Sequence, residues 1–294
     1  MTVIGIFGPT ASGKTRVAAA LAERFPADLV SADAMQVYRG LPILTNQGPG
    51  RLVALWPLDH EASVGEYAPL AQAAIDEILA SGRTPIVVGG TGLYLRAALA
   101  DLALPAAPAP GERERWEQVY DDDPALAHER LAGLDPAAAA AVHPNDRRRV
   151  VRALELAAAG ASLAPATDRL WAEETRHPTV VVGLDVPKDV LERRIEERTR
   201  AMFDAGVVDE VRAALAGPIS STARKTLGLD EVAALPREEA IEAIVVRTRR
   251  YAAYQRKWMR RVPGLVMVDA DRPPGEIADD IVSLAGTREH LPRQ

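Results

Sequence analysis

The chain has 294 residues, of which 48% are hydrophobic and 26% charged, and its formal net charge is −6. This composition is typical of a globular protein with enough apolar residues for a sizeable core. The absence of cysteine excludes disulfides, thiolate catalysis and cysteine-bound zinc. The sequence contains neither a long uncharged apolar stretch nor a leader-like start, so we expect a cytoplasmic protein without a membrane segment.

Strands and helices alternate in the first third of the predicted secondary structure. Short runs rich in valine and isoleucine are typical of buried strands, and apolar residues at helical spacing predict the helices between them. Such alternation indicates a parallel sheet with right-handed crossovers. In chain order we expect a strand at 3–8, a helix at 14–25, a strand at 27–33, a loop at 40–60, a helix at 66–80, a strand at 84–90 and a helix from 92.

The pattern changes after a segment rich in proline and alanine at 105–111, which we interpret as a linker. Helical periodicity without a convincing strand follows, and further strands are expected at 179–186 and 262–270, with helices between them. The simplest architecture is a sheet domain interrupted by a small all-helical insertion. The predicted bounds are 1–112 and 178–294 for the core and 113–177 for the insertion.

A glycine-rich segment, GPTASGKT, joins the first predicted strand to the first predicted helix. It matches G-x-x-x-x-G-K-[ST] in the strand–loop–helix context that this phosphate-binding motif requires. In such a loop, backbone N–H groups surround phosphate oxygens, the lysine adds a full charge, and the last hydroxyl can bind Mg²⁺. The predicted phosphate-binding residues are Gly8, Thr10, Ala11, Ser12, Gly13, Lys14 and Thr15, with Thr15 also the metal ligand. The expected fold class is therefore α/β, a P-loop NTPase-like parallel sheet flanked by helices, although the motif leaves the reaction open.

Two further predicted strands end in residues that carry chemistry. Asp33 follows the second strand, and Thr91 follows the third within the glycine-rich turn 89–92. Because ligands of open parallel sheets bind beyond the carboxyl ends of the strands, both are expected near the phosphates. Asp33 is a candidate general base, or else a helix cap or an indirect ligand of Mg²⁺, and Thr91 either contacts substrate or only opens a helix. Classical nucleotide hydrolases also need an aspartate at the end of a second strand to hold the metal. Apart from Asp33, the candidate is Asp185, which fits an ordinary strand end equally well.

Basic residues are concentrated in two segments despite the negative net charge. Residues 147–152 carry four arginines, three of them in the first turn of a predicted helix, where they oppose the helix dipole. Residues 247–261 carry seven basic residues and no acidic one, interleaved with aromatic residues. RNA phosphates and stacked bases explain both segments, but so do a solvated surface and, for the aromatics, a helix core. Arg194 and Arg198, one turn apart, either reach the phosphate loop or pair with glutamates of their own helix.

Seven segments, taken in order, resemble the bacterial tRNA dimethylallyltransferase (tRNA isopentenyltransferase) family. They cover most of the chain at roughly the spacing of the family, so the resemblance depends on far more than the phosphate loop. The matching segments are GPTASGKT (8–15), SADAMQVYRG (31–40), GGTGLYL (89–95), DPAAAAAVHPNDRRRVVRALEL (135–156), RRIEERTRAMFDAGVVDEV (193–211), KTLGL (225–229) and RTRRYAAYQRKWMRR (247–261).

The resemblance implies an enzyme that transfers a dimethylallyl group from dimethylallyl diphosphate to N6 of the adenosine immediately 3′ of the anticodon in tRNA, releasing diphosphate. Asp33 would remove the N6 proton, Thr91 would hydrogen-bond at the reacting centre, and Arg198 would help the phosphate loop and Mg²⁺ to hold the diphosphate. The insertion would hold the anticodon stem-loop, and we expect a monomer. The residues implied to contact tRNA are Asp33, Ala34, Met35, Gln36, Thr91, Arg113, Arg148, Arg149, Val150, Val151 and Arg152.

The chain departs from the family pattern after Asp33. Ala34 stands where the family usually has serine, and residues 43–49 and 56–60 differ from the usual segments. These differences concern substrate detail more than reaction type, so an enzyme that acts on free adenine nucleotides stays open as a second function. A small-molecule kinase that binds ATP on the same loop would leave the basic segments unexplained, and an RNA-binding nucleotide switch would lack a clear second metal aspartate.

Overall fold

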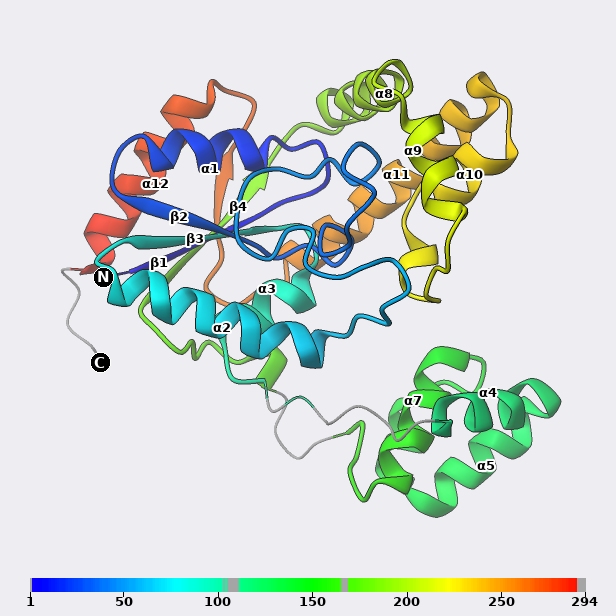
Figure 1. Ribbon diagram of the computed structural model, residues 1–294. Coiled ribbons are helices and arrows are strands. Elements are labelled where there is room, and N and C mark those ends of the chain that lie inside the picture. The colour runs from blue at the N-terminus through cyan, green and yellow to red at the C-terminus, as the bar shows by residue number, and fades with distance from the viewer. Residues whose placement is uncertain (1, 103, 105–110, 165–168, 290–294) are drawn as a thin grey trace. The chain divides into compact units, whose positions relative to one another are not determined.

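The computed structural model describes residues 2–102, 104, 111–164 and 169–289, which form two compact units (Figure 1). The larger, which we call the sheet unit, is Met1–Leu102 together with Glu173–Gln294, and the smaller, the helical unit, is Ala103–Ala172. Each unit has its own cluster of buried apolar side chains.

The helical unit ends earlier in the chain than the expected bound of 177, because the residues just before that bound pack on the sheet unit. Arg176 Nη2 lies 3.0 Å from Asp76 Oδ2, and His177 Nε2 lies 2.7 Å from Asp76 Oδ1. The Arg176 backbone N–H also donates to the Leu99 carbonyl at 2.9 Å. These contacts, which the local sequence pattern does not reveal, make Arg176 and His177 part of the sheet unit.

The sheet has five parallel strands in the order β2-β3-β1-β4-β5, which confirms the predicted fold class. Phe7 at the end of β1 is in register with Gly89 of β3 on one side and Gly183 of β4 on the other. The loops that follow these strands therefore start side by side. The strands are β1 Val3–Phe7, β2 Ala27–Ser31, β3 Thr84–Gly89, β4 Thr179–Asp185 and β5 Val266–Asp269.

Helices cover both faces of the sheet because alternate residues of its strands point to opposite sides. Ile4 and Ile6 pack in one apolar cluster with α1 and α12, whereas Val3 and Phe7 pack in the other with α2 and α3 (Figure 1). Helices α8 and α11 pack along each other, and so do α9 and α10. The helices of this unit are α1 Lys14–Ala22, α2 Val64–Ala80, α3 Gly92–Leu99, α8 Lys188–Asp204, α9 Val207–Leu215, α10 Leu229–Ala234, α11 Arg237–Met259 and α12 Pro274–Glu289, with the 3₁₀ turn η2 Ala223–Lys225.

The helical unit uses Asp-Pro pairs to start its helices. Asp123 accepts hydrogen bonds from the N–H groups of Ala125 and Leu126, and Asp135 caps the next helix in the same way; a proline occupies the first helical position after each. The side chains of Trp116, Tyr120, Leu131 and Leu154 are among those that fill its core. The elements are α4 Glu112–Asp122, α5 Pro124–Leu134, α6 Pro136–Ala141, α7 Arg147–Ala158 and the 3₁₀ turn η1 Arg169–Trp171. Among the described helices of either unit, none combines the length and apolar character needed to cross a membrane.

Candidate functional site

A cavity of about 960 Å³ lies in the sheet unit, where the loops after β1, β2 and β3 meet helices α8 and α11. The structure brings most of the residues predicted for the site in this unit to its lining: Thr10, Ala11, Gly13, Lys14, Thr15, Asp33, Ala34, Met35, Gln36, Thr91 and Arg198. Arg194, Lys225, Arg247, Arg250, Tyr251 and Gln255 also line the cavity. Lys225 was given no role from the sequence, Arg194 was one of two arginines considered for the phosphate loop, and the other four belong to the segment 247–261, for which RNA contact was one interpretation. The lining is therefore rich in basic side chains, as a site for an anionic ligand requires.

The phosphate loop contains two residues with positive φ, of which only one is a glycine. Gly13 has φ 92°, which glycine tolerates, but Ala11 has φ 63°, a left-handed value that strains a residue with a Cβ. Lys14 Nζ donates to the carbonyls of Gly8 and Pro9, at 2.9 and 2.8 Å. Burial lowers the pKa of Lys14 to about 8, although the charge of Asp33 opposes this shift. The lysine is thus held inside the loop, a position from which it can face a bound phosphate chain.

Two side chains of the loop have unusual surroundings. Ser12 is 2% exposed, and among the described residues nothing hydrogen-bonds to its Oγ. A buried polar atom of this kind normally has a partner, but Ser12 is not among the residues that line the cavity, so the structure does not bring this predicted residue to it. Arg198 Nη1 donates to Thr10 Oγ1 at 2.8 Å, which places its guanidinium at the loop, whereas Arg194 pairs with Asp271 at 3.0 Å rather than with glutamates of α8. Burial lowers the pKa of Arg198, and the charge of Asp33 opposes this.

Asp33 and Thr91 are linked through Ala34, which follows Asp33 in the chain and hydrogen-bonds to Thr91. Asp33 Oδ1 accepts from the Met35 N–H at 2.9 Å, so the aspartate closes a turn and does not cap a helix. Thr91 is the N-cap residue of α3, but its side chain makes no capping bond; instead Oγ1 accepts from the Ala34 N–H at 3.3 Å. A Cβ at Gly89 would lie 2.1 Å from the Ala32 carbonyl oxygen, which explains the glycine. The Thr91 hydroxyl is therefore held next to the turn that contains Asp33, and both residues line the cavity.

The loop after Asp33, where the chain departs from the family pattern, contributes to the cavity over residues 44–46. Glu210 of α9 accepts from the N–H groups of Ile43 and Leu44, both at 2.8 Å, and so fixes the turn. Gln36 Nε2 donates to the carbonyls of Asn46 and Thr45, at 3.0 and 3.3 Å. The amide of Gln36, expected to contact adenosine, thus also holds this turn in place.

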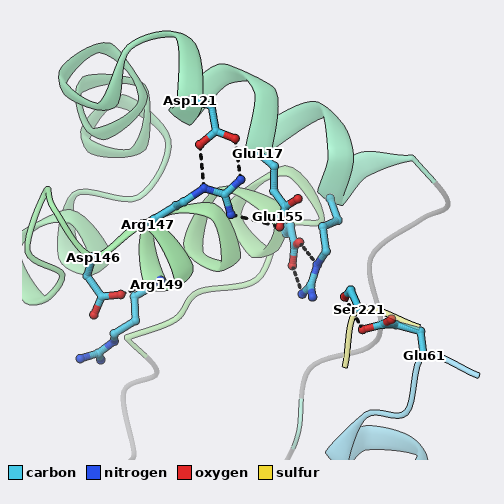
Figure 2. Close-up of polar contacts among 9 residues, drawn as sticks. Glu61, Glu117, Asp121, Asp146, Arg147, Arg149, Glu155 and Ser221 are labelled. Atoms are coloured by element: carbon cyan, nitrogen blue, oxygen red, sulfur yellow. Dashed lines mark hydrogen bonds and ion pairs between the residues drawn. The ribbon is translucent and has the colours of Figure 1, made fainter. Parts of the chain in front are cut away.

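The second divergent stretch, residues 56–60, packs on itself: the rings of Trp56 and His60 stack with centroids 5.0 Å apart. The adjoining Glu61 accepts hydrogen bonds from Ser221 Oγ, at 3.0 Å, and from the Thr222 side chain (Figure 2). Glu61 thereby anchors the segment that leads into Lys225 at the cavity. This stretch supports the site without lining it.

The aromatic and basic residues of α11 divide between the two roles that the sequence left open. Tyr251 lines the cavity, and burial together with the charge of Asp33 raises the pKa of Tyr251 to about 12. Tyr254 is 55% exposed, whereas Trp258 packs against Gly92, where a Cβ would lie 2.2 Å from Trp258 Cε3. The helix therefore supplies a cavity wall, an exposed ring and a core contact.

Asp185, the candidate for a second metal aspartate, lies 3.6 Å from the Arg256 guanidinium. It is not part of the cavity lining, so the structure favours the ordinary strand end. Among the described residues, no group of three or more His, Cys, Asp or Glu side chains could hold a metal ion. The hydroxyl of Thr15 and the carboxylate of Asp33 are oxygen donors at the phosphate loop, and Mg²⁺ commonly takes few protein oxygens beside those of a phosphate ligand.

The arginines predicted to contact tRNA in the helical unit differ in their surroundings; Figure 2 labels one of them, Arg149, beside Asp146. Arg113 and Arg152 both donate to Glu155, with shortest distances of 2.8 Å each. Arg148 and Arg149 are exposed at the start of α7, where Asp146 accepts from the Arg149 N–H at 3.1 Å. This cap and the pairing of Arg147 with Asp121 at 2.6 Å offset the cluster of positive charge at a helix N-terminus.

Val150 and Val151, also predicted to contact tRNA, are 0% and 3% exposed and belong to the core of the helical unit. Their side chains cannot reach a ligand outside the unit, so that expectation is corrected to the backbone at most. The physical reason is helical periodicity: side chains next to exposed arginines in sequence lie on the opposite, apolar face of α7.

The chain matches two protein-family models and is similar to known enzymes over most of its length. The family model described as IPP transferase matches residues 36–262, and the one described as isopentenyl transferase matches residues 1–51. The tRNA dimethylallyltransferase of Thermobifida fusca is 39% identical, covering 92% of this chain and 91% of that protein. The enzyme of the same name from Anaeromyxobacter dehalogenans (strain 2CP-C) is 41% identical, covering 95% and 98%.

Solved structures give the same result. The tRNA isopentenylpyrophosphate transferase of Bacillus halodurans is 30% identical with a TM-score of 0.70, covering 98% of this chain and 97% of that one. A eukaryotic dimethylallyltransferase acting on tRNA has a TM-score of 0.76 at 24% identity, covering 100% of this chain and 81% of that one. At that identity the second likeness establishes the fold alone.

Proposed function

The chain belongs to the IPP transferase family, and from this premise we propose that it transfers a dimethylallyl group from dimethylallyl diphosphate to N6 of the adenosine immediately 3′ of the anticodon in tRNA, releasing diphosphate. One observation carries the proposal: a single cavity joins a phosphate loop to Asp33 and Thr91. This arrangement can hold a diphosphate donor beside a general base, which a prenyl transfer to an amine requires.

At the donor end of the proposed reaction, the site must stabilise the negative charge of the departing diphosphate. As the C1–O bond of the dimethylallyl group breaks, its electron pair leaves with the diphosphate, whose charge grows. Lys14, Arg198 and the N–H groups of the phosphate loop lie where they neutralise that charge. When bound, Mg²⁺ would add further neutralisation, and Thr15 with the diphosphate oxygens would hold it.

The acceptor end of the proposed reaction needs a base, because the N6 lone pair of adenine is delocalised into the ring. As N6 forms its bond to C1, the N6 proton passes to the Asp33 carboxylate. The hydrogen bond between Thr91 Oγ1 and the Ala34 N–H supports a role for Thr91 in orienting the acceptor beside Asp33. The target base must leave its stack in the anticodon loop to enter such a cavity.

We place the tRNA backbone on the helical unit, where Arg148 and Arg149 are exposed and Arg113 and Arg152 are oriented by Glu155. Arginines in fixed orientation suit phosphate oxygens, which position RNA without reading its sequence. The working form in this proposal is a monomer in the cytoplasm, with the whole cavity built from one chain.

A transfer assay separates this proposal from the competing functions. The protein and Mg²⁺ are incubated with radiolabelled dimethylallyl diphosphate and unmodified tRNA, adenosine monophosphate or neither, with ATP hydrolysis followed in parallel. Label in tRNA alone is the expected result. Label in adenosine monophosphate but not in tRNA would favour the enzyme of free nucleotides, and ATP turnover without transfer would favour a kinase or a nucleotide switch.

A further inference from the structure

Gln255 of α11 is a polar residue with 2% of its surface exposed, and both ends of its amide are engaged with distant parts of the chain. Its Oε1 accepts from the Thr10 N–H at 2.7 Å, and its Nε2 donates to the Gly90 carbonyl at 2.8 Å. A Cβ at Gly90 would lie 2.2 Å from that Nε2, so the glycine there makes room for the amide. We call this bridge the amide strut.

The strut joins the two loops that carry the opposite ends of the proposed reaction. Thr10 belongs to the phosphate loop, and Gly90 directly precedes Thr91. The two loops leave neighbouring strands in register at Phe7 and Gly89, but beyond those residues the ladder between the strands ends. The Gln255 amide supplies hydrogen bonds across the gap where the backbone ladder no longer does.

The rest of α11 makes the strut a rigid one. Tyr251 lies one turn before Gln255 on the same helix, and both residues line the cavity. Arg198 of α8 also holds Thr10, donating to its hydroxyl oxygen at 2.8 Å. The helix itself is anchored by buried apolar residues such as Ile244. Side chains locked by packing hold a site more closely than mobile ones do.

We infer that Gln255 is a positioning residue, which sets the separation between the diphosphate of the donor and the acceptor held at Asp33 and Thr91. The inference rests on the proposed function. It predicts that loss of the strut impairs the reaction of the bound substrates more than their binding, because a misplacement of about 1 Å can cost about 100-fold in rate.

The test compares Gln255→Met with a matched control, Gln72→Met. Methionine keeps most of the length and volume of glutamine but makes neither bond. Gln72 also bridges elements of the sheet unit, donating to the carbonyls of Ala97 at 3.0 Å and Ala100 at 3.4 Å, and it is outside the cavity lining. For the full-length protein we measure kcat, the KM of each substrate and the folded fraction by circular dichroism.

The expected result is a kcat about 100-fold below that of Gln72→Met, with both KM values changed by less than about threefold. A kcat within about threefold of the control overturns the inference, as does a raised donor KM with unchanged kcat. If Gln255→Met does not fold, Gln255→Glu decides by kcat alone: it keeps the acceptor for Thr10 and loses the donor to Gly90, while its added charge beside the phosphate loop changes donor KM in any case. Wild-type protein without any transfer would instead refute the proposed function.

Discussion

Replacing Glu155 by glutamine measures what a buried carboxylate contributes to the helical unit. The Glu155 side chain, labelled in Figure 2, is 0% exposed. It accepts from Arg113 and Arg152, each at 2.8 Å. Breaking a buried pair costs about 3–5 kcal/mol when the remaining charge stays buried. Here the Arg113 and Arg152 side chains are 44% and 26% exposed and can turn to water, so we discount the loss. The expected destabilisation is about 2 kcal/mol, the size of one charged hydrogen bond.

Hydrogen exchange measured by mass spectrometry on the full chain can detect this loss of stability within the helical unit alone. A loss of about 2 kcal/mol corresponds to about 30-fold less protection of the α4 and α7 amides. Glu129→Gln serves as the control, because Glu129 is an exposed carboxylate of the same unit. Equal protection in the two variants would refute the argument that burial makes Glu155 different.

The pH dependence gives a second readout of the same pair. Burial raises the pKa of Glu155, but the hydrogen bonds from Arg113 and Arg152 outweigh this and bring it below its ordinary value of 4.5. A pKa lowered by folding adds stability above the unfolded pKa, and this stability is lost as the pH falls through the folded pKa. Wild type and Glu155→Gln should therefore differ in protection at neutral pH and converge in acid.

Three further changes test the cavity. Asp33→Asn should abolish transfer, because an amide cannot take the N6 proton, while tRNA affinity stays within about fivefold. Asp28→Asn, in the strand β2 that precedes Asp33, should keep activity. Lost tRNA binding in Asp33→Asn would make Asp33 a binding residue instead. Burial lowers the pKa of Lys14 to about 8, so its ammonium charge disappears as the pH rises past that value and donor affinity should fall there in a binding titration; a flat profile would contradict this. Gly90→Ala, with a Cβ 2.2 Å from the amide strut, should lower kcat about tenfold. Gly217→Ala, where a Cβ has nothing within 4 Å, should leave kcat unchanged, and equal kcat values in the two variants would count against the strut.

Features that depend on a few consecutive residues could be predicted from the sequence. The phosphate loop was predictable because glycine, lysine and hydroxyl at fixed spacing between a strand and a helix serve one purpose. The placement of Asp33 and Thr91 at the cavity followed from the rule that parallel strands present their carboxyl ends at one edge. The family resemblance, carried by ordered segments of the same kind, added the reaction, which the motif alone left open.

Contacts between residues far apart in the chain could not be predicted in this way, because they depend on how the elements pack. Gln255 reaches Thr10 and Gly90 over separations of 245 and 165 positions, and no local pattern marks such a residue. The same holds for α7, where the phase of the helix turns Val150 into the core and leaves Arg149 exposed. Strand order and helix phase bring these side chains together or apart, because packing selects among contacts that backbone propensity leaves equally possible.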